Sequence, residues 1–215
     1  MLPSRPWVLG LGYAGAAFAA AHAYAFRVIL GAQDDPDDMG ELLTYFASNR
    51  TLFLVWVFAA IALWIVLVSL LPAIWRALGR GWAATAAVAA MFLGAVINIA
   101  GDGSQFPTIF LSARYASADE SLQVGLVAAA GEVSDAVGAL LGVGIAPLFV
   151  GLLAAALVSA LRRTPGGRGY GSLFVLFGLA TVPVGPPIVG AALNLLIFAS
   201  IAYFTARALA AEPHT

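Results

Sequence analysis

Cysteine and lysine are both absent from this chain of 215 residues, and histidine occurs only twice, at His22 and His214. Without cysteine the chain forms no disulfide, thiolate metal site or iron–sulfur cluster. Two histidines, one of them in the polar C-terminal tail, are too few for a multi-histidine metal site. Without lysine there is no amine for a Schiff base to a retinal-like group. The residues therefore point to no metal and no cofactor.

Charged residues are also scarce, at 10% of the chain, whereas hydrophobic residues make up 62%. A soluble domain of this size carries about 25% charged and about 45–50% apolar residues. So much apolar surface cannot be hidden in a water-soluble core. The composition therefore predicts an integral protein of the cell membrane. The net charge of −1 gives no indication of nucleic-acid binding.

Six apolar segments are long enough to cross a membrane, since a spanning helix needs about 20 apolar residues. They predict a single all-α transmembrane domain with helices at residues 7–30, 52–74, 82–101, 122–161, 170–186 and 188–208. The fourth segment would form a helix of about 60 Å, roughly twice the thickness of the hydrocarbon core. We also expect a short amphipathic helix over Met39–Ser48, in the loop after the first span.

The positions of the arginines favour six spans over seven. With six spans, seven arginines fall on the side of the two termini, and only Arg50 and Arg114 fall in the connections on the other side. The positive-inside rule then places both termini in the cytoplasm. Splitting the fourth segment would move Arg162, Arg163 and Arg168 outside. The first segment also contains the A-x-A triplets of a cleavable leader, but its apolar run is longer than a leader requires.

Few ionisable or amide side chains lie within or beside the predicted spans. Such groups are functional-site candidates by default, because placing them in a bilayer is costly. In the predicted topology they all fall in the outer half of the membrane or at its outer rim. The candidates are His22, Arg27, Asn98, Asp102, Glu132, Asp135 and Asn194.

Glu132 and Asp135 are the candidates for catalysis. They lie three residues apart, so both side chains point to one side of a helix. Arg27 is the natural partner for one of them, and the second carboxyl would then stay protonated if it were buried. Such a group is suited to act as a general acid or as a proton carrier. Their depth in the membrane depends on which end of the fourth span is used for counting.

The same part of the fourth span carries small residues. Gly131, Gly138 and Gly142 share a stripe with Asp135, and stripes of this kind let another helix approach closely. A non-catalytic association with this protein itself or with another membrane protein is therefore an alternative. In that interpretation an Arg27–carboxylate pair only joins helices.

The remaining candidates also have structural interpretations. His22 fits a packed, hydrogen-bonded core residue, and Asn98 and Asn194 fit hydrogen bonds between helices. Asp102, between two glycines, would most simply cap a helix end or turn. Trp7, Trp75 and Trp82 fit the aromatic belt at the cytoplasmic side and require no cofactor; all three lie at predicted span ends.

The chain resembles a family of small bacterial six-helix membrane proteins known only as a domain of unknown function. The likeness rests on the motif at residues 45–50 (YFASNR), on residues 71–76 (LPAIWR), which close the second span, and on Arg162-Arg163 after the long fourth span. The resemblance covers most of the chain and implies the six-helix topology. It implies no reaction and no catalytic residue.

Three functions are compatible with these residues. The first is an enzyme or binding protein that admits a lipid-like or isoprenoid molecule from the outer leaflet. Glu132 or Asp135 would then supply acid–base chemistry for an isomerase, cyclase or hydrolase. The ligand would be oriented by His22, Arg27, Asn98, Asp102 and Asn194. The second is a non-catalytic subunit of a membrane complex, and the third is a proton- or ion-coupled transporter.

Overall fold

The computed structural model describes residues 4–32, 38–162 and 186–210, and every regular element within these ranges is a helix. The all-α fold class is therefore confirmed. The helices are α1 (Arg5–Gly31), α2 (Met39–Ser48), α3 (Arg50–Ala77), α4 (Trp82–Gly103), α5 (Phe106–Tyr115), α6 (Glu120–Arg162) and α8 (Pro187–Ala210). The short helix α2 has the bounds expected from the sequence, and the Asp38 carboxylate caps it by accepting hydrogen bonds from the Gly40 and Glu41 amides.

Within the described ranges, five helical stretches are long and apolar enough to cross a membrane, as expected for a helical membrane protein. They are Arg5–Ile29, Arg50–Ala77, Trp82–Tyr115, Glu120–Arg162 and Pro187–Ala210. They correspond to five of the six predicted spans. The remaining predicted span, residues 170–186, lies outside the described residues except for Pro186.

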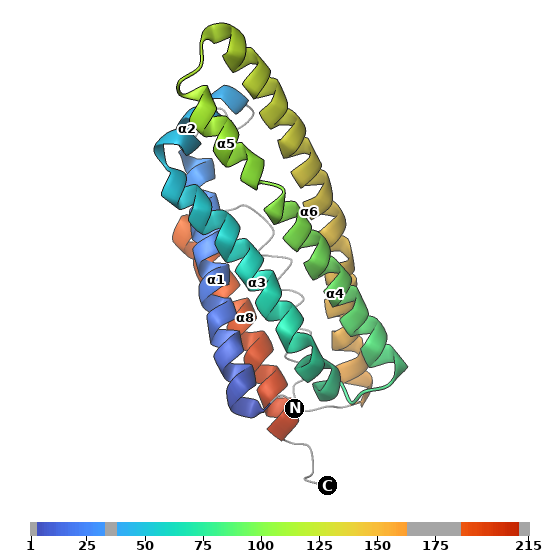
Figure 1. Ribbon diagram of the computed structural model, residues 1–215. Coiled ribbons are helices and arrows are strands. Elements are labelled where there is room, and N and C mark those ends of the chain that lie inside the picture. The colour runs from blue at the N-terminus through green and yellow to red at the C-terminus, as the bar shows by residue number, and fades with distance from the viewer. Residues whose placement is uncertain (1–3, 33–37, 163–185, 211–215) are drawn as a thin grey trace.

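The helices form an elongated bundle (Figure 1). Helix α1 packs against α8 and α3, and α3 joins this group to α4, which packs along α6. Helix α5 follows α4 towards the end of the bundle where α2 lies, and the first half of α6 covers both short helices (Figure 1). Helix α6 is a single helix of 43 residues that continues through Pro147, as its apolar length predicts.

Glycines allow α4 and α6 to approach closely. A Cβ atom at Gly94 would lie 2.8 Å from the Gly144 carbonyl oxygen, and one at Gly151 would lie 2.7 Å from the Met91 backbone nitrogen. Both distances are too short for a real Cβ, so only glycine fits at these two positions. Small residues that bring backbones together are a main source of helix association in membranes.

The predicted stripe on α6 does not make this contact. A Cβ at Gly131, Gly138 or Gly142 would meet no described atom within 4 Å. The reason is that α4 packs on the face of α6 that carries Gly144 and Gly151, whereas the stripe lies on another face. Spacing alone predicted which residues share a face, but not which face is covered.

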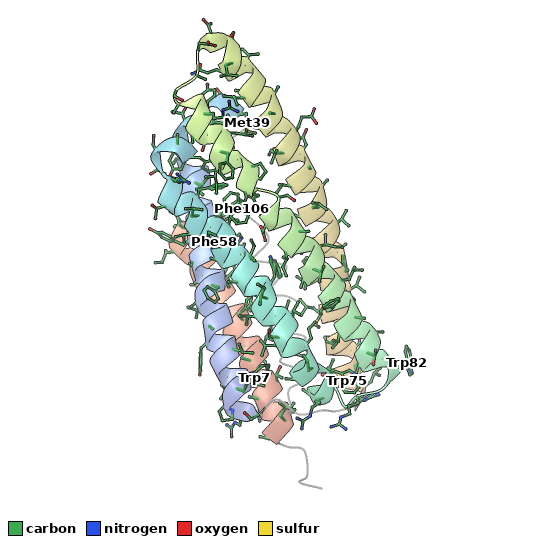
Figure 2. All side chains as sticks on the ribbon, in the orientation of Figure 1. Trp7, Met39, Phe58, Trp75, Trp82 and Phe106 are labelled. Atoms are coloured by element: carbon green, nitrogen blue, oxygen red, sulfur yellow. The ribbon has the colours of Figure 1, made fainter. Side chains whose placement is uncertain are left out.

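Charge and tryptophan are distributed unequally between the two ends of the bundle. Figure 2 shows Trp7, Trp75 and Trp82 at one end and Met39 at the other. The helix ends and turn beside the three tryptophans carry Arg5, Arg76, Arg80, Arg162 and Arg207. The end with α2 carries most of the described carboxylates, at Asp38, Glu41, Asp119 and Glu120. Asp119 accepts a hydrogen bond from the Leu122 amide, which lowers the pKa of its carboxyl below the ordinary value.

The turn between α3 and α4 is fixed by an arginine from α6. Gly79, Arg80 and Gly81 all have positive φ angles, of 80°, 54° and 91°. Arg162 Nη1 donates hydrogen bonds to the carbonyl oxygens of Leu78, Gly79 and Arg80, at 3.0, 2.7 and 2.7 Å. A single guanidinium thus satisfies carbonyls that the end of a helix leaves without partners.

We expect Arg162→Gln to destabilise the protein by about 1 kcal/mol, because a glutamine amide cannot reach all three carbonyls. The apparent melting temperature should fall by roughly 2–4 °C, measured on the purified protein in detergent. Arg114→Gln is the matched control, since Arg114 is exposed at the other end of the bundle. Equal melting temperatures for the two variants would contradict this role.

Candidate functional site

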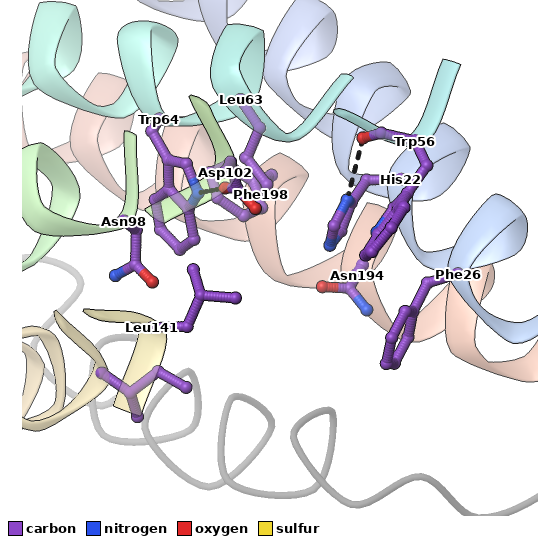
Figure 3. A pocket seen from close by; sticks show the side chains of 11 residues that line it. His22, Phe26, Trp56, Leu63, Trp64, Asn98, Asp102, Leu141, Asn194 and Phe198 are labelled. Carbon is purple, nitrogen blue, oxygen red and sulfur yellow. Dashed lines mark hydrogen bonds between the residues drawn. The ribbon is translucent and has the colours of Figure 1, made fainter. Parts of the chain in front are cut away.

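A cavity of about 190 Å³ lies in the middle of the bundle, between α1, α3, α4, α6 and α8. Figure 3 shows its side chains converging from these helices. The described lining residues are His22, Phe26, Trp56, Leu63, Trp64, Asn98, Asp102, Leu141, Ile145, Asn194 and Phe198. Four of the seven residues predicted for the site are among them: His22, Asn98, Asp102 and Asn194. The cavity therefore brings together polar groups from three helices.

Asp102 is the buried carboxylate of this cavity, with only 3% of its surface exposed. Its Oδ2 atom accepts a hydrogen bond from Trp64 Nε1 at 2.9 Å, and Oδ1 accepts a longer one from Gln105 Nε2 at 3.4 Å. It therefore does not cap the turn after α4, which was the simplest structural interpretation. Helix α5 begins without a side-chain cap.

Asp102 also lies further from the end of its apolar helical stretch than the sequence predicted. The third span was expected to end at residue 101, but the apolar helical stretch runs from Trp82 to Tyr115. Pro107 stands in the first turn of α5, a position where proline starts a helix and does not break one. The side chain of Asp102 faces Trp64 at the middle of α3.

His22 reaches across from α1 to α3. Its Nδ1 lies 3.2 Å from the Trp56 carbonyl oxygen, and because a carbonyl can only accept, Nδ1 donates. In the neutral imidazole this leaves Nε2 as a hydrogen-bond acceptor. The ring also stacks on Phe26 and Trp56, with ring centroids 6.3 and 6.4 Å away. His22 is thus both a packed residue and a wall of the cavity.

The two asparagines bond within their own helices. Asn98 Nδ2 donates to the Gly94 carbonyl at 2.8 Å, and Asn194 Nδ2 donates to the Gly190 carbonyl at 3.0 Å. In the described part of the chain neither amide bonds to another helix, so neither makes the predicted link between helices. The carbonyl oxygen of each amide accepts no bond from a described residue and is available to a bound molecule.

Arg27 does not line the cavity. Its side chain crosses α8 at Gly190, where a Cβ would lie 2.7 Å from Arg27 Cδ. The absence of a side chain at Gly190 therefore leaves room for Arg27 to cross α8. Asn194 follows one turn later on the same helix. Arg27 lies close to the site but touches none of the space described above.

Glu132 and Asp135 lie outside the cavity. Both are exposed on α6, and neither forms a hydrogen bond or ion pair with any described residue. The structure thus does not show the predicted pair with Arg27. Their neighbours Val133 and Ser134 line a space together with residues of α2. Both carboxylates therefore lie level with the part of the bundle that carries α2.

Trp56 and Trp64 are the site residues that the sequence analysis missed. Both line the cavity, and Trp64 holds Asp102. Tryptophan in membrane proteins concentrates at the two interfaces, but these two lie inside a span of 28 residues. Their spacing of eight residues also places them near the same face of the helix. Two tryptophans within one predicted span, near the same helix face, were the sequence signal that could have identified these site residues.

The groups left unused in this cavity are mainly hydrogen-bond acceptors. The N–H groups of Trp64, Gln105 and His22 Nδ1 are already bonded within the protein. The remaining lone pairs of Asp102, His22 Nε2 and the two asparagine oxygens are not. The arrangement can therefore hold a molecule that is largely apolar and carries a hydrogen-bond donor. No protein-family model, curated protein or solved structure matches this chain, so the resemblance to the six-helix family rests on the quoted residues alone.

Proposed function

We propose that this protein binds a small lipid-like molecule, such as an isoprenoid alcohol, in the cavity between α1, α3, α4, α6 and α8. The observation that carries the proposal is the convergence of Asp102, His22, Asn98 and Asn194 with two tryptophans in one cavity at the middle of membrane-length helices. Polar groups within membrane-spanning helices cost free energy, so their presence there favours a functional role.

The orientation follows from charge. Arginines gather at the end with Trp7, Trp75 and Trp82, and positive residues are retained in the cytoplasm. We therefore place that end, with both termini, inside the cell and the end with α2 outside, in the plasma membrane. The ligand would then reach the cavity from the outer half of the bilayer.

Asp102 takes the role that the sequence analysis gave to Glu132 and Asp135. It is the only described carboxylate lining the cavity, and it is held by Trp64 in one orientation. It would orient the donor group of the ligand, and in an enzymatic reaction it would exchange a proton with that group. Glu132 and Asp135 lie outside the cavity, where they suit contact with another membrane protein.

The test is mass spectrometry of the molecules that co-purify with the gently solubilised protein. We expect one defined small molecule with the wild type and its loss from Asp102→Asn, because the amide presents a donor where the carboxylate presents an acceptor. Glu132→Gln is the matched control and should retain the molecule. If all three samples carry only bulk phospholipid, the proposal fails and the partner-subunit function is favoured.

A further inference from the structure

A second cavity of about 270 Å³ lies beside the first, towards the end of the bundle with α2. Its described walls come from α1, α2, α3, α5 and α6 and are mainly apolar, with Met39, Leu42 and Phe46 on the α2 side and Val133 and Val137 on the α6 side. Phe46 packs on Phe53 with ring centroids 4.3 Å apart. Helix α2 thus covers this cavity at the outer end.

The two cavities share a wall. Phe26, Trp56 and Leu141 line both of them. The rings of Phe26 and Trp56 stack with centroids 5.7 Å apart. Gln105 lines the second cavity and donates its hydrogen bond to Asp102 in the first. Three side chains are therefore common to both linings, and the two spaces are direct neighbours. Rotation of these side chains would connect them.

We propose that both cavities together hold one elongated amphiphile, with a hydroxyl or phenol head in the first cavity at Asp102 and a hydrocarbon chain in the second cavity under α2. This inference rests on the proposed function and gives its ligand a chemical class. Sites for small molecules usually have volumes of about 300–1,000 Å³. Neither cavity reaches this range alone, but both together do.

The polar groups define the head. Most of the free groups around Asp102 are acceptors, which match the O–H donor of an alcohol or phenol. Among the described residues that line the two cavities there is no arginine. A phosphate or carboxylate head would therefore face the Asp102 carboxylate without a compensating cation. The site fits a neutral donor head and disfavours an anionic one.

The experiment compares two phenols that differ in chain length. Binding of 4-ethylphenol and 4-decylphenol is measured by isothermal titration calorimetry on the protein in lipid nanodiscs, with empty nanodiscs as the reference for partitioning. Gly138 lines the second cavity, and a Cβ there meets no described atom within 4 Å. Gly138→Leu therefore fills the cavity. It should weaken binding of 4-decylphenol about tenfold, because the chain and the leucine compete for one space, and leave 4-ethylphenol unchanged.

Controls separate the two parts of the proposal. Gly142→Leu adds the same side chain one turn later on α6, outside both cavities, and should change neither affinity. Ser134→Leu fills the second cavity from one turn earlier on α6 and repeats the test if Gly138→Leu does not fold. In the wild type, 4-decylanisole should bind about tenfold more weakly than 4-decylphenol, since it lacks the O–H donor.

The outcomes are distinct. If Asp102→Asn weakens both phenols but neither cavity-filling variant affects 4-decylphenol, the second cavity is not part of the site and the inference is overturned alone. If Asp102→Asn changes neither affinity, or if neither phenol binds, both this inference and the proposed function are overturned. Equal binding of 4-decylanisole and 4-decylphenol would overturn the donor head.

Discussion

Gly151→Val should separate α4 from α6 and leave little folded protein. A Cβ at this position would lie 2.7 Å from the Met91 nitrogen and 2.8 Å from the Ala87 carbonyl oxygen. These are backbone atoms, so no side-chain rotation relieves the clash. Forcing extra atoms into a packed core costs about 3 kcal/mol at the upper end of the usual range, which is a large share of a typical stability of about 5–15 kcal/mol.

The measurement is the yield of monodisperse protein in fluorescence-detected size-exclusion chromatography, followed by the apparent melting temperature. Gly142→Val is the matched control, because a Cβ at Gly142 meets no described atom within 4 Å. It should keep the wild-type yield. Equal losses for the two variants would show that the close approach of α4 and α6 does not control folding.

Trp64→Phe should destabilise the protein by about 1–3 kcal/mol, because it leaves the buried Asp102 carboxylate without its short hydrogen bond. The remaining bond, from Gln105, is 3.4 Å long. Phenylalanine retains most of the apolar contact of the indole. The loss therefore reports mainly on the N–H donor and its partner.

A double-mutant cycle isolates that hydrogen bond. In an Asp102→Leu background there is no carboxylate to satisfy, so Trp64→Phe should then cost little. The free energies of unfolding are measured by steric trapping in bicelles. An equal cost of Trp64→Phe in both backgrounds would show that Trp64 contributes only packing. If Asp102→Leu alone raises the free energy of unfolding, Asp102 is kept at a cost in stability, as a residue retained for binding would be.

The helices could be predicted from the sequence because bilayer thickness imposes a simple length rule. Apolar runs gave the helical character of α1, α3, α4, α6 and α8, and the amphipathic pattern gave α2 with its bounds. The same rule did not predict α5, because this short helix with a proline in its first turn is not a span of its own. The third span was therefore expected to end at residue 101, directly before Asp102.

The site was predictable only in part. Rarity of polar groups was sufficient to select His22, Asn98, Asp102 and Asn194, which share the cavity. It also selected Glu132 and Asp135, because spacing along α6 does not reveal which face the neighbouring helices cover. Trp56 and Trp64 were missed because tryptophan is usually interpreted by its role at the interface. Their importance depends on tertiary contacts with residues more than thirty positions away.

The length of α6 has a consequence for the surrounding lipid. A helix of 43 residues is about 64 Å long, and to fit within a hydrocarbon core of about 30 Å it would need a tilt of roughly 60°. Membrane helices tilt by no more than about 40°. Apolar surface nevertheless extends over the whole bundle, from Trp82, which is 85% exposed, to Val124, which is 69% exposed. Bilayer thickness therefore determines how much of this surface is covered, and a thick, long-chain membrane suits the protein better than a thin one.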